Sequence, residues 1–224
     1  MEKLQLINHL SDFVTNNRLE TFHFVLGNRT RHITIVLEEI FQSHNASAVL
    51  RTCDCYGIQD VHVIENRNVF DPNPEIALGS SKWLTINSSK STIESIKNLK
   101  EKGYRIVATV PQKDAVLLNN FDLNKGKTAL LFGTELTGLT PEAISLADEF
   151  IKIPMYGFTE SFNISVSVSI ILSNLVERLK LSSIDWQLST DEKNNILFEW
   201  LKESIHSSDK IIERYISQNA SLNK

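Results

Sequence analysis

Thr128-Ala-Leu-Leu-Phe-Gly-Thr-Glu-Leu-Thr-Gly138 is the stretch that decides the fold class. Residues 128–132 form a largely apolar run of strand length that ends at Gly133, which is typical of a buried strand in a parallel sheet. In open sheets of this class, ligands bind beyond the carboxyl ends of the strands. Glycine also lets the backbone approach a ligand closely. The junction after residue 132 is therefore a candidate binding site.

Strand and helix patterns alternate on both sides of this stretch. Apolar and β-branched runs predict further strands at residues 33–37, 61–64, 105–109 and 150–153. Helices are expected at residues 46–56, 91–102 and about 163–181. Residues 66–87 form a looser stretch with a short helical piece. The alternation predicts an α/β fold, with a parallel sheet flanked by helices on both faces.

Both ends of the chain have helical periodicity. Residues 4–26 are predicted to form one or two helices, and residues 191–218 form an amphipathic helical tail. The sequence thus predicts a body at 31–182, with an N-terminal helical extension at 1–30 and a C-terminal one at 183–224.

Composition bounds the class of protein. The chain has 224 residues, 42% of them hydrophobic and 22% charged, which suits a soluble globular protein. The first ten residues lack the apolar run of a signal peptide, and no stretch approaches the roughly 20 apolar residues of a membrane span. We expect a cytoplasmic protein that does not contact a membrane.

The two cysteines, Cys53 and Cys55, predict no metal site. Cysteines at this spacing rarely form a disulfide, and two of them cannot build a four-ligand zinc site. We expect two buried, reduced thiols.

The net charge of −4 argues mildly against non-specific binding to nucleic acid. A local basic face stays compatible with that charge. Its candidates cluster near the start of the chain: Arg18, Arg29 and Arg31, with Arg51 a little beyond.

Three segments carry candidate chemistry, and each has an ordinary structural interpretation. Asn45-Ala-Ser-Ala-Val-Leu-Arg51 opens a helix, so Asn45 could simply be its N-cap. Gly133-Thr-Glu-Leu-Thr-Gly138 could be a tight turn with Glu135 capping the next helix. It is not a P-loop, because Leu139 stands where lysine is required, and it lacks the G-x-G-x-x-G fingerprint of dinucleotide-binding folds.

The third segment runs from Ile153-Pro-Met-Tyr-Gly157 to Ser161-Phe-Asn163, at the end of a strand and the start of a helix. Ser161 and Asn163 could be helix caps. The small residues that follow indicate close packing of this helix, against a second subunit in one interpretation.

The order and spacing of the three segments resemble the motifs of the SpoU family of SPOUT RNA 2'-O-methyltransferases. The patterns are Asn-x5-Arg, Gly-x-Glu-x-x-Gly and Ile-Pro-Met-x-Gly-x-x-x-Ser-x-Asn-x-Ser-Val. The resemblance covers residues 30–180, and flanking residues such as Arg51-Thr-Cys-Asp54 look like the TrmH branch. It implies a SPOUT-type sheet with a C-terminal trefoil knot, a homodimer, and S-adenosylmethionine as cofactor.

The resemblance also assigns residues to the cofactor site. Three loops would bind S-adenosylmethionine largely through backbone groups, at Thr109, at Gly133, and from Ile153 through Pro154 and Met155 to Phe162. Family members usually carry leucine where Phe162 stands, so this wall of the pocket would differ.

In the implied reaction a methyl group moves to a ribose 2'-hydroxyl. The family assigns activation of the hydroxyl to the arginine at position 51. Arginine is a poor base because its pKa exceeds about 12, so electrostatic stabilisation of the forming alkoxide is the alternative role for Arg51. Asn45 would orient Arg51 or the ribose, Ser161 would contact the site, and Glu135 and Asn163 would brace the motif loops.

Three functional alternatives remain open at this point. Helical extensions and N-terminal arginines favour the branch that acts on guanosine 18 of tRNA, with residues 1–30 contacting tRNA. Ribosomal RNA or another tRNA position is the first alternative, although relatives of that kind often carry a longer N-terminal RNA-binding domain. The others are a non-catalytic RNA-binding homologue and a general nucleotide-binding protein.

Overall fold

A computed structural model describes residues 2–40, 42–66, 70, 73–111 and 114–222. The chain divides into two compact units, of which one is Thr30–Trp186 and the other combines Met1–Arg29 with Gln187–Lys224. We call them the sheet unit and the helical unit.

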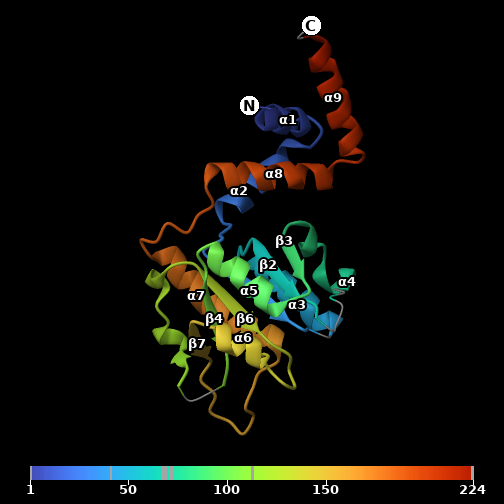
Figure 1. The fold of residues 1–224 in the computed structure, drawn as a ribbon. Helices are drawn as coiled ribbons and strands as arrows, with labels where there is room; N and C mark the ends of the chain where they lie inside the picture. The colour runs from blue at the N-terminus through green and yellow to red at the C-terminus, as the bar shows by residue number, and fades with distance from the viewer. Residues whose placement is uncertain (1, 41, 67–69, 71–72, 112–113, 223–224) are drawn as a thin grey trace. The chain divides into compact units, whose positions relative to one another are not determined.

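The sheet unit is built on seven parallel strands in the order β3-β2-β1-β6-β4-β7-β5 (Figure 1). In chain order the strands are β1 Ile33–Glu38, β2 Asp60–Ile64, β3 Thr85–Ser89, β4 Arg105–Thr109, β5 Val116–Leu117, β6 Thr128–Phe132 and β7 Glu149–Lys152. β1 and β6 lie side by side near the centre, and their residues are buried throughout. The predicted parallel sheet flanked by helices is confirmed.

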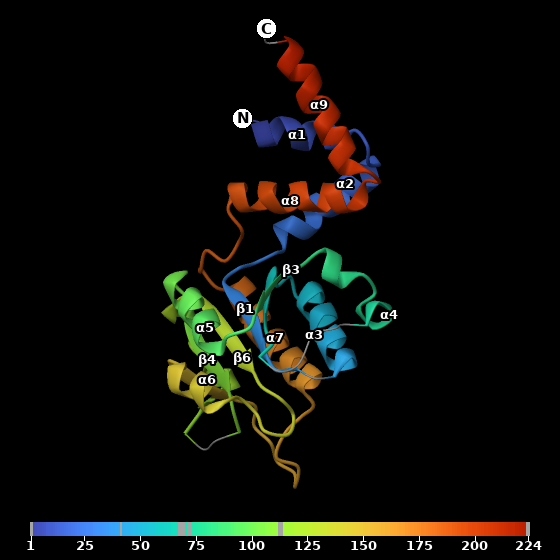
Figure 2. The same ribbon diagram turned by 45° about the vertical axis from the view of Figure 1, so that its right-hand side comes forward.

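Each face of the sheet is covered by its own pair of longer helices. Helices α3 (Ser43–Cys55) and α7 (Ile164–Leu181) cover one face, where Thr52 of α3 and Ser169 of α7 place their hydroxyls 3.3 Å apart. Figure 2 shows these two helices side by side. Helices α5 (Thr92–Glu101) and α6 (Pro141–Leu146) cover the opposite face. Strand residues alternate between the two cores, so Ile35 packs with α3 and α7, while Val36 packs with α5 and α6.

Short elements complete the sheet unit: α4 Pro74–Ala77, η1 Ser80–Lys82, η2 Leu118–Asn120 and η3 Leu123–Lys125. The strands β3 and β5 were not predicted. Thr85-Ile-Asn-Ser-Ser89 is polar and only partly buried, and β5 has just two residues, so neither carries the apolar pattern of a strand.

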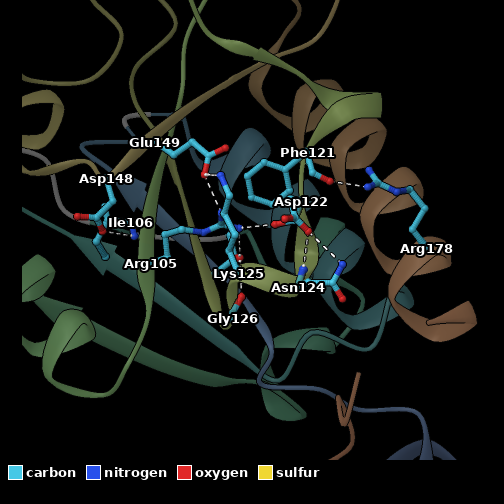
Figure 3. Close-up of polar contacts among 11 residues, drawn as sticks. Arg105, Ile106, Phe121, Asp122, Asn124, Lys125, Gly126, Asp148, Glu149 and Arg178 are labelled. Carbon is cyan, nitrogen blue, oxygen red and sulfur yellow. Dashed lines mark hydrogen bonds and ion pairs between the residues drawn. The ribbon is translucent and has the colours of Figure 1, made fainter. Parts of the chain in front are cut away.

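A polar network holds the segment that joins β5 to β6 (Figure 3). Arg105 of β4 donates to the Asp122 backbone oxygen at 2.8 Å and pairs with Glu149 of β7 at 2.6 Å. From α7, Arg178 donates to the backbone oxygens of Leu118, at 3.1 Å, and of Phe121. Two hydrogen bonds from Asn124 lower the pKa of the Asp122 carboxyl, so this carboxylate stays charged. Two arginines therefore fix one connecting segment against both β7 and α7.

Two histidines of the sheet unit are kept neutral by burial. Desolvation lowers the pKa of His62 on β2 below its ordinary value of 6.5, against the opposing effect of the Asp60 carboxylate. Desolvation also lowers the pKa of His32, whose side chain is only 8% exposed. Both side chains would have to take up a proton on acid unfolding.

The helical unit consists of α1 Glu2–Ser11, α2 Asn16–Gly27, α8 Thr190–Ser204 and α9 Ser208–Leu222. Phe22 of α2 packs against Trp200 of α8 with ring centroids 5.6 Å apart. Ser189 and Glu192 form a capping box that fixes the start of α8. The predicted C-terminal tail is thus two helices, since Ile205 ends α8 and Ser207 adopts a positive φ of 58° before α9 begins.

The expected cluster of surface arginines is wrong in part. Arg29 is fully buried, with its guanidinium 5.4 Å from the Trp200 ring centroid. Arg31 pairs with Asp60 at 2.9 Å. Of the two thiols expected to be buried, Cys53 is buried but Cys55 is exposed, and neither forms a disulfide. Among the described helices, none combines the length and apolar character that crossing a bilayer demands.

Candidate functional site

The three motif segments meet through their polar side chains. Asn45 and Asn163 both donate from Nδ2 to the same carboxylate oxygen, Oε1 of Glu135, at 2.8 and 2.7 Å. Asn163 Nδ2 also lies 3.1 Å from Oδ1 of Asn45, which accepts from it. Residues 90 and 118 positions apart along the chain therefore form one hydrogen-bonded triangle, which we call the amide–carboxylate triangle.

Two helix starts hold the amides of this triangle. Helix α3 begins at Ser43 after β1, so Asn45 lies within its first turn and is 3% exposed. The alternative that Asn45 is the N-cap is wrong, because Gln42 occupies that position and instead accepts from Asn45 Nδ2 at 2.8 Å. Asn163 does cap α7, since its Oδ1 accepts from the Ser165 backbone N–H at 2.9 Å.

A tight loop after β6 holds the carboxylate. Thr134 and Gly138 exchange two backbone hydrogen bonds, each 3.0 Å long, which close the loop. A Cβ at Gly133 would lie 2.2 Å from Gly138 backbone atoms, so only glycine fits this closure. The alternative role for Glu135 as a helix cap is wrong, because Thr140 caps α6 by accepting from the Ala143 N–H at 3.2 Å.

A buried carboxylate fixes the far end of the same loop. Glu38, the last residue of β1, is 1% exposed. It accepts from the Thr140 N–H at 2.9 Å, from the Thr140 hydroxyl at 2.8 Å and from the Thr92 hydroxyl at 2.6 Å. Glu38 thereby ties the end of β1 to the starts of α5 and α6, and fixes the end of the loop that carries Glu135.

A cavity of about 420 Å³ opens beside the triangle, beyond the carboxyl ends of β4, β6 and β7. A cavity of this volume can hold a nucleoside-sized ligand. Seven of the residues predicted from the sequence line it: Thr109, Gly133, Glu135, Ile153, Met155, Ser161 and Phe162. Pro154, predicted with them, is not among the lining residues.

The walls combine apolar surface with a few charges. The apolar lining includes Leu139, Ile144 and Ile171, which sequence reasoning did not identify because each has the pattern of an ordinary core residue. Glu160 and Lys152 are charged lining residues that were also missed. Glu160 precedes Ser161 of the third motif, and this adjacency was the only signal that could have found it.

Arg51 lies apart from the triangle. It is an exposed residue of α3, six positions beyond Asn45, which corresponds to roughly 9 Å along a helix axis. It does not line the cavity. Within the described part of the chain, no hydrogen bond or ion pair holds its guanidinium. Asn45 and Arg51 thus share helix α3, but only Asn45 belongs to the amide–carboxylate triangle.

The described residues contain no group of three histidine, cysteine, aspartate or glutamate side chains that could hold a metal ion.

A model of the SpoU rRNA methylase family matches residues 32–173. The chain belongs to this family. Within it, a relative from Borreliella burgdorferi, named tRNA (guanosine(18)-2'-O)-methyltransferase, is 46% identical over 202 residues, which are 90% of this chain and 92% of the relative. A relative of the same name from Thermus thermophilus is 35% identical over 84% of this chain and 98% of the relative.

Solved structures of the SpoU family share the fold. The crystal structure of the A. aeolicus TrmH/SpoU tRNA modifying enzyme superposes with a TM-score of 0.75 and 32% identity. The match covers 85% of this chain and 98% of that enzyme, so the similarity extends beyond the sheet unit.

Proposed function

We propose that this chain uses S-adenosylmethionine to methylate the ribose 2'-hydroxyl of guanosine 18 in tRNA. The observation that carries the proposal is the amide–carboxylate triangle, which joins Asn45 and Asn163 to Glu135, a residue that lines the cavity. The substrate is taken from relatives that align over nearly their whole length.

The cavity residues fit S-adenosylmethionine. The volume suits a nucleoside with an amino-acid arm, and the apolar wall offers a surface for its base. Glycine at 133 leaves backbone groups accessible, and the carboxylates of Glu135 and Glu160 favour a cationic ligand. When bound, the cofactor supplies an activated methyl group. Thr109, Gly133 and the loop from Ile153 through Pro154 and Met155 to Phe162 would hold it.

The protein's part in the reaction is to place the 2'-hydroxyl and to stabilise charge as it develops. We assign Arg51 to the ribose oxygen as an electrostatic stabiliser, because a guanidinium remains protonated at neutral pH. Asn45 and Asn163 orient the site, Glu135 joins them, and Ser161 contacts the site from the third motif. Replacement of Arg51 by alanine should abolish turnover at saturating cofactor, and near-normal turnover would contradict the assignment.

A homodimer would explain how Arg51 can act at the triangle although the two lie apart in one chain. The face of α3 and α7 carries exposed Val166 (42%), and Phe162 (42%) lies just before α7. If this face meets a second copy, Arg51 of the partner subunit can approach the triangle of the first.

Mixing two inactive variants tests such a shared site. When Arg51→Ala and Asn163→Ala subunits exchange freely, half of the dimers are mixed and each has one intact site. About a quarter of wild-type activity should then return. If sites lie within single chains, no activity returns, and sedimentation showing a monomer would also contradict the dimer.

A trefoil knot is part of the proposal. β7 lies between β4 and β5, both of which precede it in the chain. The chain enters β7 from α6 on one face of the sheet and leaves it for α7 on the other. The segment from β5 to β6 crosses on the α7 side, where Phe121 is buried. An experimental structure in which the path of the chain forms no knot would contradict this part of the proposal.

The proposed domains are a methyltransferase body at residues 31–182 and helical extensions at residues 1–30 and 183–224. We assign tRNA contact to the N-terminal extension. Bound tRNA should slow amide hydrogen exchange in residues 1–30, and unchanged exchange would contradict this assignment. The proposed location is the cytoplasm, which fractionation of cells tests.

Mapping of 2'-O-methyl groups tests the function itself. Purified protein is incubated with S-adenosylmethionine and unmodified tRNA, and nuclease fragments are examined by mass spectrometry. The proposal expects one new methyl group on the ribose of guanosine 18. Methylation only in ribosomal RNA or at another tRNA position would overturn the substrate, and no methylation of any RNA would overturn the activity.

A further inference from the structure

The reaction releases a proton that the site must accept. The ribose 2'-oxygen forms a bond to the methyl carbon while the carbon–sulfur bond of the sulfonium breaks and its electron pair stays on sulfur. The hydroxyl proton then needs a base within hydrogen-bond reach. An arginine cannot serve at neutral pH, because its guanidinium already carries its full set of protons.

Glu135 is anchored by one carboxylate oxygen only. Both amide donors, from Asn45 and Asn163, are directed at Oε1. In the described parts of the chain, Oε2 accepts no hydrogen bond. Glu135 is exposed and lines the cavity, so the second oxygen remains available to a ligand there. A side chain that needed only to brace two amides would not require this oxygen.

Other side chains at the cavity meet the requirement less well. The amides of Asn45 and Asn163 are not bases. Among the lining residues that the structure describes, Glu160 is the only other carboxylate, and no hydrogen bond or ion pair with a described residue fixes its position. Proton transfer depends on a positioned group, which favours the carboxylate held by two donors.

We propose that Oε2 of Glu135 accepts the proton of the ribose 2'-hydroxyl. The proposal rests on the proposed methyl transfer and gives Glu135 a catalytic role beyond bracing. Arg51 then acts on the same oxygen by charge alone. The two asparagines become positioning residues, since they hold Oε1 of Glu135, a residue of the cavity lining, and leave its second oxygen without a hydrogen bond in the described parts of the chain.

Glu135→Gln separates bracing from proton transfer. The glutamine carbonyl can still accept from both asparagines, and its NH2 group replaces the free oxygen. The expected result is a fall in kcat of about 100-fold or more, the usual range for loss of a general base. At saturating S-adenosylmethionine, the KM for tRNA should stay within about threefold. Glu142→Gln, on the exposed first turn of α6, is the matched control and should keep wild-type kcat.

Chemical rescue covers the case in which Glu135→Gln disturbs the loop. In Glu135→Ala, small carboxylates added to the buffer should restore methyl transfer, and the restored rate should rise with the basicity of the carboxylate from formate to acetate. If the added carboxylate only filled the space left by the side chain, the restored rate would not depend on the basicity of the carboxylate.

The outcomes distinguish this inference from the function on which it rests. Three results would each overturn the role of Glu135. The first is a wild-type kcat in Glu135→Gln, and the second is a fall in kcat that occurs in Glu160→Gln but not in Glu135→Gln. The third is a rescued rate that does not depend on the basicity of the added carboxylate. The wild-type protein would still methylate guanosine 18 in all three cases. Failure of the wild-type protein to methylate RNA would instead overturn the proposed function.

Discussion

Replacing Gly133 by alanine should open the loop that carries Glu135. The added Cβ would lie 2.2 Å from the Gly138 carbonyl carbon and oxygen and 2.3 Å from the Leu139 nitrogen. These distances fall about 1.2 Å short of the 3.4 Å at which ordinary contact begins. All three atoms belong to the backbone, so no side-chain rotation relieves the overlap, and the loop itself must move.

The structure sets the size of the effect. Opening the loop sacrifices the two hydrogen bonds between Thr134 and Gly138, worth about 0.5–1.5 kcal/mol each. Unrelieved overpacking costs about 1–3 kcal/mol. Either route gives a loss of about 1–3 kcal/mol in the free energy of unfolding, which corresponds to a fall in Tm of roughly 2–12 °C for a chain of this size.

Calorimetry measures both expected consequences of Gly133→Ala. Thermal scans should show the fall in Tm, and titration with S-adenosylmethionine should show binding weakened at least about tenfold, since each 1.4 kcal/mol is a factor of ten. Gly27→Ala adds the same methyl group where no atom lies within 4 Å and should leave binding unchanged. Wild-type affinity together with wild-type Tm in Gly133→Ala would refute the reasoning.

Three further substitutions probe the frame of the site. Asn163→Ala should lower the free energy of unfolding by about 0.5–2 kcal/mol through loss of the α7 cap and should also abolish turnover. The control Ser91→Ala removes the α5 cap and should lower the free energy of unfolding by a similar amount with turnover intact. Equal turnover in the two variants would argue against the triangle. Arg178→Met should lower the free energy of urea unfolding by about 2–4 kcal/mol, because two backbone oxygens lose a charged donor, and exposed Glu177→Ala should change it by less than about 0.5 kcal/mol; equal effects would contradict the role of the network. Below pH 6.5 the unfolded chain protonates His62 while the folded chain keeps it neutral, so the free energy of unfolding should fall as the pH drops from about 7.5 to about 5.5. His62→Gln should weaken this dependence. An unaltered pH profile in the variant would contradict the burial of His62 as its cause.

The centre of the fold could be predicted from local sequence because its physical cause is local. β1 and β6 are short apolar runs that end at a polar or glycine residue, and such runs are buried wherever they occur in a parallel sheet. The edge strand Thr85–Ser89 escaped prediction because an edge strand is stabilised by backbone pairing and needs little apolar surface. Arg29 was misjudged for a related reason, since its burial beside Trp200 is a tertiary feature that the local sequence does not show.

The site depended on a different kind of information. Asn45, Glu135 and Asn163 each have an ordinary capping interpretation, and nothing in their local sequence indicates that they share hydrogen bonds. Their convergence follows from the strand order, which places the ends of β1, β6 and β7 along one edge of the sheet. Pairings among distant strands are set by the whole core, so resemblance to a family indicated that these residues share one site, whereas periodicity could not. The free oxygen of Glu135 became visible only with coordinates.

The most direct test of the central claim uses two tRNA molecules that differ by a single oxygen atom. One carries guanosine at position 18 and the other carries 2'-deoxyguanosine there, and each is incubated with the purified protein and S-adenosylmethionine labelled on its methyl group. The account predicts incorporation approaching one methyl group per molecule into the first tRNA and none into the second. Equal labelling of the two tRNAs would contradict methyl transfer to the ribose of nucleotide 18.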